Sequence, residues 1–260
     1  MQKSDGQMYA PQGKPNPVCE KGEFRFAAVG LDHGHIYGMT NGLREAGGEL
    51  VRVYDPDPGK VEAFRSMYPE VQCASSEEEV LEDESLHLIA SAKITSERGP
   101  FGLKVMDHRK HYFSDKAPFT TFEQLEKAQA KVGETGLIWA VYYSERLHVE
   151  GAVYAGKLIR NGAIGRVLQV LNIAPHRLNV ASRPEWFFIK KKYGGILCDL
   201  GSHQIEQFLY YADAKDARVM YSQVANFNNP HYPELEDFGD ALLIADNEAT
   251  LYFRVDWFTP

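Results

Sequence analysis

Hydrophobic and polar positions alternate along residues 23–142 in the way of a parallel α/β sheet. The run FRFAAVG at 24–30 is apolar and ends in glycine, which is typical of a buried parallel strand. The segment at 35–47 has apolar residues at helical spacing and then two glycines that would end a helix. Further strands are expected at 49–55, 86–92, 110–116 and 137–143. Further helices are expected at 61–68, 100–110 and 120–136, and one more helix should begin after the serine cap at 75–76. Because strands that alternate with such helices form right-handed βαβ units, we expect a doubly wound parallel sheet of Rossmann type over 23–142.

The second half of the chain has a different order of elements. A helix is expected at 149–162, a long strand at 166–178 and a helix from about Gly201. Three strands then follow without a helix between them, at 217–227, 237–246 and 248–258. Consecutive strands of this kind pair in an antiparallel sheet, so residues 143–260 are predicted to form an α+β domain with a mainly antiparallel, open-faced sheet.

Composition narrows the class of protein. The 260 residues carry 28 Lys and Arg against 36 Asp and Glu, a net charge of −8, which argues against binding to a nucleic-acid backbone. The chain has no apolar run of the roughly 18 residues that a membrane span needs, so no membrane partner is expected. Three cysteines without metal-ligand spacing favour a reducing compartment, and we predict a cytoplasmic protein. Residues 1–22 are polar and rich in Pro and Gly, and we expect a flexible tail.

The turn VGLDHGHIYG after the first strand is the first candidate site. Gly30 matches the first glycine of a dinucleotide-binding turn, while Asp32 and His35 stand where the second and third glycines are usual. Asp55 ends the second strand, where such folds bind a ribose hydroxyl; alternatively it only caps the turn that follows. A carboxylate there would repel the 2′-phosphate of NADP, and no basic residue follows before Lys60, so NAD is favoured over NADP.

Two other groups of residues could carry chemistry. Asp115 and Lys116 end the predicted strand at 110–116, at the carboxyl edge of the sheet where these folds bind ligands, although a lysine there can also be merely solvated. Asp199 and His203 are four residues apart and would share one helix face, either as a carboxylate beside a general base or as a cap with a surface histidine. A metal site of Asp32, His33 and His35 is not expected, because adjacent turn residues rarely converge on one ion.

Taken together, residues 24–258 resemble the glucose–fructose oxidoreductase, inositol dehydrogenase and MocA (GFO/IDH/MocA) family. KHYFSDKAPFTTFEQL looks like the family's Glu-Lys-Pro segment and the threonine-capped helix after it, with Asp115 for the glutamate and Ala117 inserted. LIRNGAIGRVLQV is similar to the entry into the second domain. GGILCDLGSHQIEQ resembles the motif Gly-Gly…Asp-x-Gly-x-His-x-x-Asp, with Glu206 as the final acid.

The resemblance implies an NAD-dependent oxidoreductase that acts on a sugar, inositol or related polyhydroxy substrate bound between the domains. It implies that His203 is the general base, that Lys116 polarises the substrate oxygen and that Asp199 holds a second hydroxyl. The expected cofactor-binding residues are Gly30, Leu31, Asp32, His33, Gly34, His35, Asp55, Thr95, Arg98, Asp115 and Lys116. The expected substrate-binding residues are Lys116, Arg146, His176, Trp186, Asp199 and His203, with a packing role as the alternative for His176 and Trp186.

Some positions depart from the family pattern and keep other functions open. Asp32 puts a carboxylate in the pyrophosphate turn and should weaken cofactor binding unless it caps the helix, binds water or is offset by His33 and His35. Arg98 and Thr95 stand where histidine and asparagine are usual in the family. Arg109 replaces a glycine in a turn, and its backbone is expected to be left-handed.

The alternative functions are an NAD-dependent glycosidase or lyase of the same family, and a catalytically silent cofactor-sensing regulator. The family also implies a homodimer or homotetramer and a sequence that continues past Pro260, so this chain is expected to be truncated in its second domain.

Overall fold

The computed structural model describes residues 16–260. The chain divides into two compact units, with the boundary between Tyr142 and Tyr143. Within the described residues, no helix combines the length and the apolar character that crossing a membrane requires. The first fifteen residues of the expected tail lie outside this description. The next ones do not form a free tail, because the Val18 amide donates to the Ala46 carbonyl at 2.9 Å and the Cys19 thiol donates to it at 3.6 Å.

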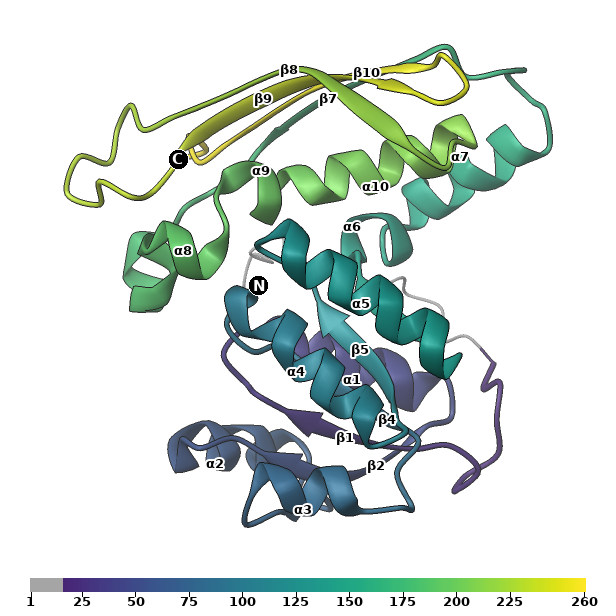
Figure 1. Ribbon diagram of the computed structural model, residues 1–260, viewed down its shortest axis with the longest axis vertical. Coiled ribbons are helices and arrows are strands. Elements are labelled where there is room, and N and C mark those ends of the chain that lie inside the picture. The colour runs from purple at the N-terminus through teal and green to yellow at the C-terminus, as the bar shows by residue number, and fades with distance from the viewer. Residues whose placement is uncertain (1–15) are drawn as a thin grey trace, which may run out of the picture. The chain divides into compact units, whose positions relative to one another are not determined.

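The first unit contains a six-stranded sheet in the order β3-β2-β1-β4-β5-β6 (Figure 1). Every neighbouring pair of strands is parallel, which confirms the predicted doubly wound fold. The strand β3 is only two residues long and both side chains are exposed, so it leaves no hydrophobic pattern in the sequence. The strands are β1 (Arg25–Val29), β2 (Glu49–Tyr54), β3 (Gln72–Cys73), β4 (Leu88–Ser91), β5 (His111–Asp115) and β6 (Trp139–Tyr142).

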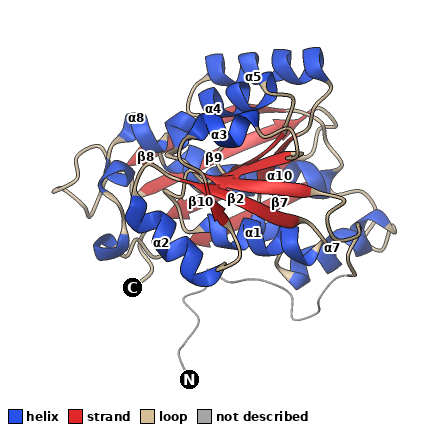
Figure 2. Ribbon diagram, turned by 90° about the horizontal axis from the view of Figure 1, so that it is seen from below, coloured by secondary structure: helices blue, strands red, loops and turns tan. Residues whose placement is uncertain are grey.

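Helices cover both faces of this sheet. Helices α1 and α2 lie on one side of the strands, and α3, α4 and α5 lie on the other (Figure 2). Alternate side chains of β1 belong to the hydrophobic cores on opposite faces of the sheet. Phe26 and Ala28 pack with α1 and α2, whereas Ala27 and Val29 pack with α3 and α4. The helices are α1 (His35–Glu45), α2 (Pro58–Met67), α3 (Glu77–Glu82), α4 (Thr95–Asp107) and α5 (Phe122–Thr135).

Local capping signals set several helix ends, but α4 begins earlier than the sequence pattern indicates. The side chains of Ser76 and Thr121 accept the amides of Glu79 and Gln124, as N-caps do. Helix α4 begins at Thr95 and carries Pro100 in its interior, not at its start. Proline cannot donate to the carbonyl four residues earlier, and the Gln124 side-chain amide donates to that carbonyl, of Ser96, at 2.9 Å. A contact from α5 therefore satisfies the group that the proline leaves unbonded.

The second unit is built on a four-stranded sheet in the order β7-β10-β9-β8. The pairs β8–β9 and β9–β10 are antiparallel and β7–β10 is parallel, so the sheet is mainly antiparallel, as predicted. Helix α10 lies against one face (Figure 1). The other face is open and apolar: Leu171 and Ile173 of β7 are 67% and 58% exposed. The elements are α6 (Ser144–Leu147), α7 (Glu150–Arg160), β7 (Gln169–Pro175), α8 (Lys190–Tyr193), α9 (Ile196–Asp199), α10 (Gly201–Ala212), β8 (Ala217–Ala225), β9 (Phe238–Ala245) and β10 (Thr250–Asp256), with 3-10 turns at Val180–Ser182 and Glu185–Phe188.

Candidate functional site

The turn between β1 and α1 is tied to its neighbours at the carboxyl end of the sheet. Gly30 donates its amide to Tyr54 and accepts the Ala92 amide, both at 3.0 Å. Its φ of +75° favours glycine, and a Cβ there would lie 2.2 Å from Cγ of Lys93. The turn thus requires glycine at position 30, and the contact of Gly30 with a dinucleotide stays a prediction.

The backbone after Gly30 has the character of an anion site. Among residues 16–260, the amides of Asp32, His33 and Gly34 have no acceptor, and α1 has no side-chain cap. A Cβ on Gly34 would have nothing within 4 Å, so the space in front of the turn is open. Adjacent amides at a helix N-terminus attract phosphate groups. The turn therefore fits the pyrophosphate of a dinucleotide.

Asp55 lies directly after β2 and connects two turns. Its Oδ2 accepts the Leu31 amide at 2.6 Å and its Oδ1 accepts the Asp57 amide at 2.9 Å. The residue is 5% exposed. The bond to Asp57 agrees with the alternative of a turn cap, but the bond to Leu31 also holds the carboxylate beside the dinucleotide-type turn.

The Asp32 carboxylate is bound by a cation that the sequence pattern did not assign to it. Lys60 of α2 donates to Asp32 Oδ1 at 2.6 Å, and its Nζ lies 3.8 Å from Asp55 Oδ1. Burial alone would lower the pKa of Lys60, but the hydrogen bond to Asp32 and the charges of Asp32, Asp55 and Asp57 raise it above its usual value. The sequence left open that Asp32 caps the helix, binds water or is offset by His33 and His35. The cap and the histidines do not apply, because α1 lacks a side-chain cap and both histidines face another carboxylate.

That carboxylate is Asp115, which is fully buried at the end of β5. It accepts from Arg98 Nη2 at 2.9 Å and from the Lys116 amide at 2.7 Å, and Nδ1 of His35 and His33 lie 2.8 and 3.2 Å from its oxygens. Burial would raise the pKa of Asp115, but Arg98 and the two imidazoles hold it well below its usual value. Burial and the nearby His35 lower the pKa of His33 to about 4. The cluster is therefore a buried carboxylate–guanidinium pair flanked by two imidazoles, of which that of His33 is neutral at pH 7.

This cluster is also where a metal ion could be considered. The potential ligand atoms of His33, His35 and Asp115 lie within 4.8 Å of one another. Asp32 is not part of the group, because its carboxylate is turned to Lys60. A divalent ion would share the Asp115 carboxylate with the buried guanidinium of Arg98, which is unfavourable for like charges. The donor set thus favours hydrogen bonding over metal coordination.

Arg98 was expected at the cofactor, and the structure instead places it inside the first unit. It is 1% exposed, and its guanidinium also donates to Lys93 O at 2.7 Å, to Ala117 O at 3.2 Å and to the Lys116 carbonyl. Arg98 therefore positions the segment at 115–117, which carries Lys116. Both Lys116 and Thr95, the first residue of α4, are buried. Arg109 has a φ of +59°, which confirms the expected left-handed residue.

In the second unit, a double-glycine turn positions Asp199 and His203. Gly194 and Gly195 have φ of +91° and +92°, and a Cβ on Gly195 would lie 2.5 Å from the Glu236 carboxylate, which accepts the Ile196 amide at 2.8 Å. Asp199 ends α9, and His203 lies in the first turn of α10 with its ring edge-on to Tyr143 at 5.6 Å. The two residues are not on one continuous helix as expected, since Leu200 separates α9 from α10. His203 is 3% exposed, so it is not the surface histidine of the alternative interpretation.

The other expected substrate residues make contacts within the second unit. Arg146 donates from Nε to both oxygens of Glu206, at 2.7 and 2.9 Å, and lies over the Tyr210 ring. His176 Nε2 lies 3.2 Å from Glu145. Trp186 is buried with its ring edge-on to Phe187.

Glu145 is the residue of this region that sequence reasoning missed. Besides its contact with His176, it accepts from the side chains of Gln204 and Gln207 of α10 at 3.3 and 3.1 Å. It belongs to none of the motifs, and its partners lie 31 to 62 residues away in sequence, so no local signal marks it.

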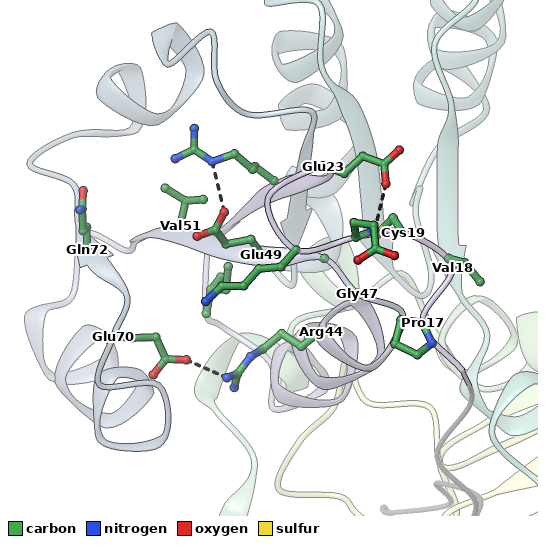
Figure 3. A pocket seen from close by; sticks show the side chains of 15 residues that line it. Pro17, Val18, Cys19, Glu23, Arg44, Gly47, Glu49, Val51, Glu70 and Gln72 are labelled. Atoms are coloured by element: carbon green, nitrogen blue, oxygen red, sulfur yellow. Dashed lines mark hydrogen bonds and ion pairs between the residues drawn. The ribbon is translucent and has the colours of Figure 1, made fainter.

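A hollow of the first unit lies at the other end of the sheet. It measures about 1000 Å³ and is lined by the chain at 17–25, the end of α1 and the start of β2 (Figure 3). Four of its seven charged side chains form two ion pairs, Arg44 with Glu70 at 2.7 Å and Arg25 with Glu49 at 3.6 Å. These four charges compensate one another and leave less charge to attract a ligand.

Comparison with known proteins supports the family resemblance. A family model described as "Oxidoreductase family, NAD-binding Rossmann fold" matches residues 24–143, and "GFO/IDH/MocA C-terminal domain" matches residues 153–260. A solved structure from Erwinia carotovora atroseptica SCRI1043, a candidate oxidoreductase, is 50% identical with a TM-score of 0.89, and the alignment covers 92% of this chain and 71% of that one. These matches confirm the predicted family and fold.

Two curated enzymes are more distant relatives. Scyllo-inositol 2-dehydrogenase (NAD(+)) of Bacillus subtilis (strain 168) is 27% identical over 236 residues, which are 90% of this chain and 64% of that protein. D-xylose dehydrogenase of Paenarthrobacter nicotinovorans is 24% identical over 149 residues, which are 55% of this chain and 38% of that protein. The chain thus spans less than two thirds of the length of either curated relative.

Proposed function

Because the chain belongs to the GFO/IDH/MocA oxidoreductase family, we propose that it is an oxidoreductase that transfers hydride between NAD and a sugar, inositol or related polyhydroxy substrate. The observation that carries the cofactor part is the turn after β1, where three amides without an acceptor among the described residues lie beside the Asp55 carboxylate. The bound dinucleotide would supply the site that accepts or donates the hydride. The names of the two curated relatives support the substrate class.

The first unit would hold the cofactor through its carboxyl edge. The amides of Asp32, His33 and Gly34 would bind the pyrophosphate, and Lys60 compensates the Asp32 carboxylate that would otherwise repel it. Asp55 would accept a ribose hydroxyl and disfavour a 2′-phosphate, hence NAD over NADP. Leu31, His35 and Thr95 belong to the same edge and would line the cofactor.

We propose that Lys116, Asp199 and His203 act on the substrate. His203 would take the proton of the reacting hydroxyl, and the ammonium of Lys116 would donate to its oxygen as negative charge develops there. Asp199 would accept a hydrogen bond from a second hydroxyl and so orient the substrate. Arg146, His176 and Trp186 would shape the substrate side, with Arg146 acting through its pair with Glu206.

The experiment combines cofactor titration with a variant of the proposed base. Purified protein is titrated with NADH and followed by nicotinamide fluorescence, and turnover is then screened on polyols and sugars. His203→Ala is expected to lower kcat by about 10²–10⁴-fold while leaving the Kd for NADH within about twofold. His231→Ala is the matched control, because His231 is an exposed histidine of the same unit. Unchanged kcat in His203→Ala would contradict the assigned base, and no NADH binding at millimolar concentration would contradict the dinucleotide site.

We also propose that a second copy of the chain covers the open face of the β7–β10 sheet. Leu171, Tyr252, Leu242 and Tyr221 are cross-strand neighbours in one row, and all but Tyr252, which is partly buried, are exposed. Large contiguous apolar patches on a protein surface usually mark an interface. Sedimentation velocity is expected to give a dimer or tetramer that Leu171→Asp dissociates. Ile164→Asp, at a residue that is 67% exposed outside the sheet, should not dissociate it. The cytoplasmic location stays a prediction.

A further inference from the structure

Four charged side chains meet beside the turn that would hold the dinucleotide. Lys60 binds Asp32 at 2.6 Å, and its Nζ is 3.8 Å from Asp55 Oδ1. Asp57, whose side chain caps α2 by accepting the Gly59 amide at 2.8 Å, is the third carboxylate of the group. Three carboxylates and one ammonium leave a net charge of 3 − 1 = 2 negative units there. Among residues 16–260, Lys60 is the only cation that forms an ion pair with Asp32 or Asp55.

This arrangement decides what a phosphate on the adenosine ribose would meet. Asp55 is the carboxylate expected to accept a ribose hydroxyl, and Lys60 is the nearest cation to it. To bind a 2′-phosphate, Lys60 would have to leave Asp32. Asp32 would then be a carboxylate without a counter-charge, close to a newly bound dianion. An unphosphorylated ribose makes no such demand, because Lys60 can stay on Asp32 while Asp55 accepts the hydroxyl.

We propose that the Asp32–Lys60 ion pair selects against 2′-phosphorylated dinucleotides, because Asp32 withholds the cation that such a phosphate would need. The inference rests on the proposed dinucleotide site and deepens it. In this proposal two residues share the discrimination between NAD and NADP: Asp55 repels the 2′-phosphate, and Asp32 keeps Lys60 in an ion pair. It also gives a function to the carboxylate that stands where a glycine is usual.

The test compares the affinities of NADH and NADPH for wild type and for Asp32→Asn, which keeps the shape of the side chain and removes its charge. In the variant, Lys60 is free to meet the phosphate. The ratio of the Kd for NADPH to the Kd for NADH is therefore expected to fall by about tenfold, the effect of one unit charge at close range. The fragments 5′-AMP and 2′,5′-ADP should show the same change, which places it at the adenosine end. Adding Lys60→Met to Asp32→Asn should restore the wild-type ratio or raise it.

A control variant and two possible negative results distinguish a failure of this inference from a failure of the proposed function. Glu78→Gln removes a carboxylate from Lys104 of the same unit, where the pair lies at 2.8 Å, and should leave the ratio within about twofold. Far-ultraviolet circular dichroism checks that each variant is folded, and Asp32→Ser replaces Asp32→Asn if that variant is not. An unchanged ratio in a variant that still binds NADH would overturn the inference alone. No binding of any of the four nucleotides to wild type would overturn the inference and the proposed cofactor together.

Discussion

The two ends of the parallel sheet of the first unit are both rich in charge, but they use it differently. At the amino end, the ion pairs line a hollow of about 1000 Å³ and are half exposed: the Arg44 and Glu70 side chains are 41% and 52% accessible (Figure 3). At the carboxyl end, the Arg98–Asp115 pair is 1% and 0% accessible, and adjacent backbone amides have no acceptor among the described residues. The more buried end carries the features of a ligand site, because its backbone amides are left to bind a ligand. The presence of a hollow is thus a poorer guide to function than uncompensated hydrogen-bonding groups.

This difference between the two ends predicts that breaking the buried Arg98–Asp115 pair has the largest effect on stability. Arg98→Met would leave the Asp115 carboxylate buried without its guanidinium, and it would remove the donors that hold the carbonyls of Lys93 and Ala117. We expect the free energy of unfolding to fall by about 3–5 kcal/mol, measured by urea denaturation. A loss below about 1 kcal/mol would show that this pair behaves like a surface pair.

The next effect concerns the turn at the carboxyl end. Gly30→Ala combines a left-handed backbone with a Cβ 2.2 Å from Lys93, and we expect a loss of about 2–3 kcal/mol in the free energy of unfolding. Gly136→Ala is the matched control, because Gly136 is left-handed at φ +68° but open space surrounds its Cβ position, so only about 1 kcal/mol should be lost. Equal losses in the two variants would mean that the packing of Lys93 on Gly30 contributes nothing.

Acid should weaken the carboxyl end through His33. Its folded pKa of about 4 lies below the usual 6.5, so the unfolded chain takes up the proton first as the pH falls. The stabilisation is therefore complete above pH 6.5 and is lost between pH 6.5 and about 4, by roughly 3 kcal/mol. The lowered pKa of Asp115 acts in the same direction at more acidic pH. Urea denaturation of wild type and His33→Gln across this range should show a flatter pH dependence in the variant, and equal slopes would contradict the assignment.

The smallest effect is expected at the amino end. Arg44→Met removes the pair with Glu70, and we expect the free energy of unfolding to change by less than about 1 kcal/mol because water screens both groups. The pH dependence between 4 and 6.5 should be that of wild type. A loss comparable to that of Arg98→Met would erase the proposed difference between the two ends.

Sequence alone was sufficient for the fold because its signals are local. Apolar runs and glycine stops predicted the helices of the first unit and all of its strands except β3. Ser76 and Thr121 marked helix starts, and Arg109 has the left-handed backbone expected of it. Each of these signals depends on neighbours within a few residues. Where a distant contact intervenes, as at Pro100 with Gln124, the predicted helix boundary was wrong.

Only the tertiary structure decided which charged groups meet. Asp32 and Lys60 are 28 residues apart, His35 and Asp115 are 80 apart, and Arg146 and Glu206 are 60 apart. Composition and spacing do not show that Arg98 binds Asp115 or that Lys60 compensates Asp32. Such pairs depend on which strand ends become neighbours in the sheet, and on burial, which strengthens a charge pair and makes an unpaired charge costly. The sequence therefore determined that the candidate residues fall at the carboxyl edge of the sheet, and the tertiary structure decided the charge that this edge presents.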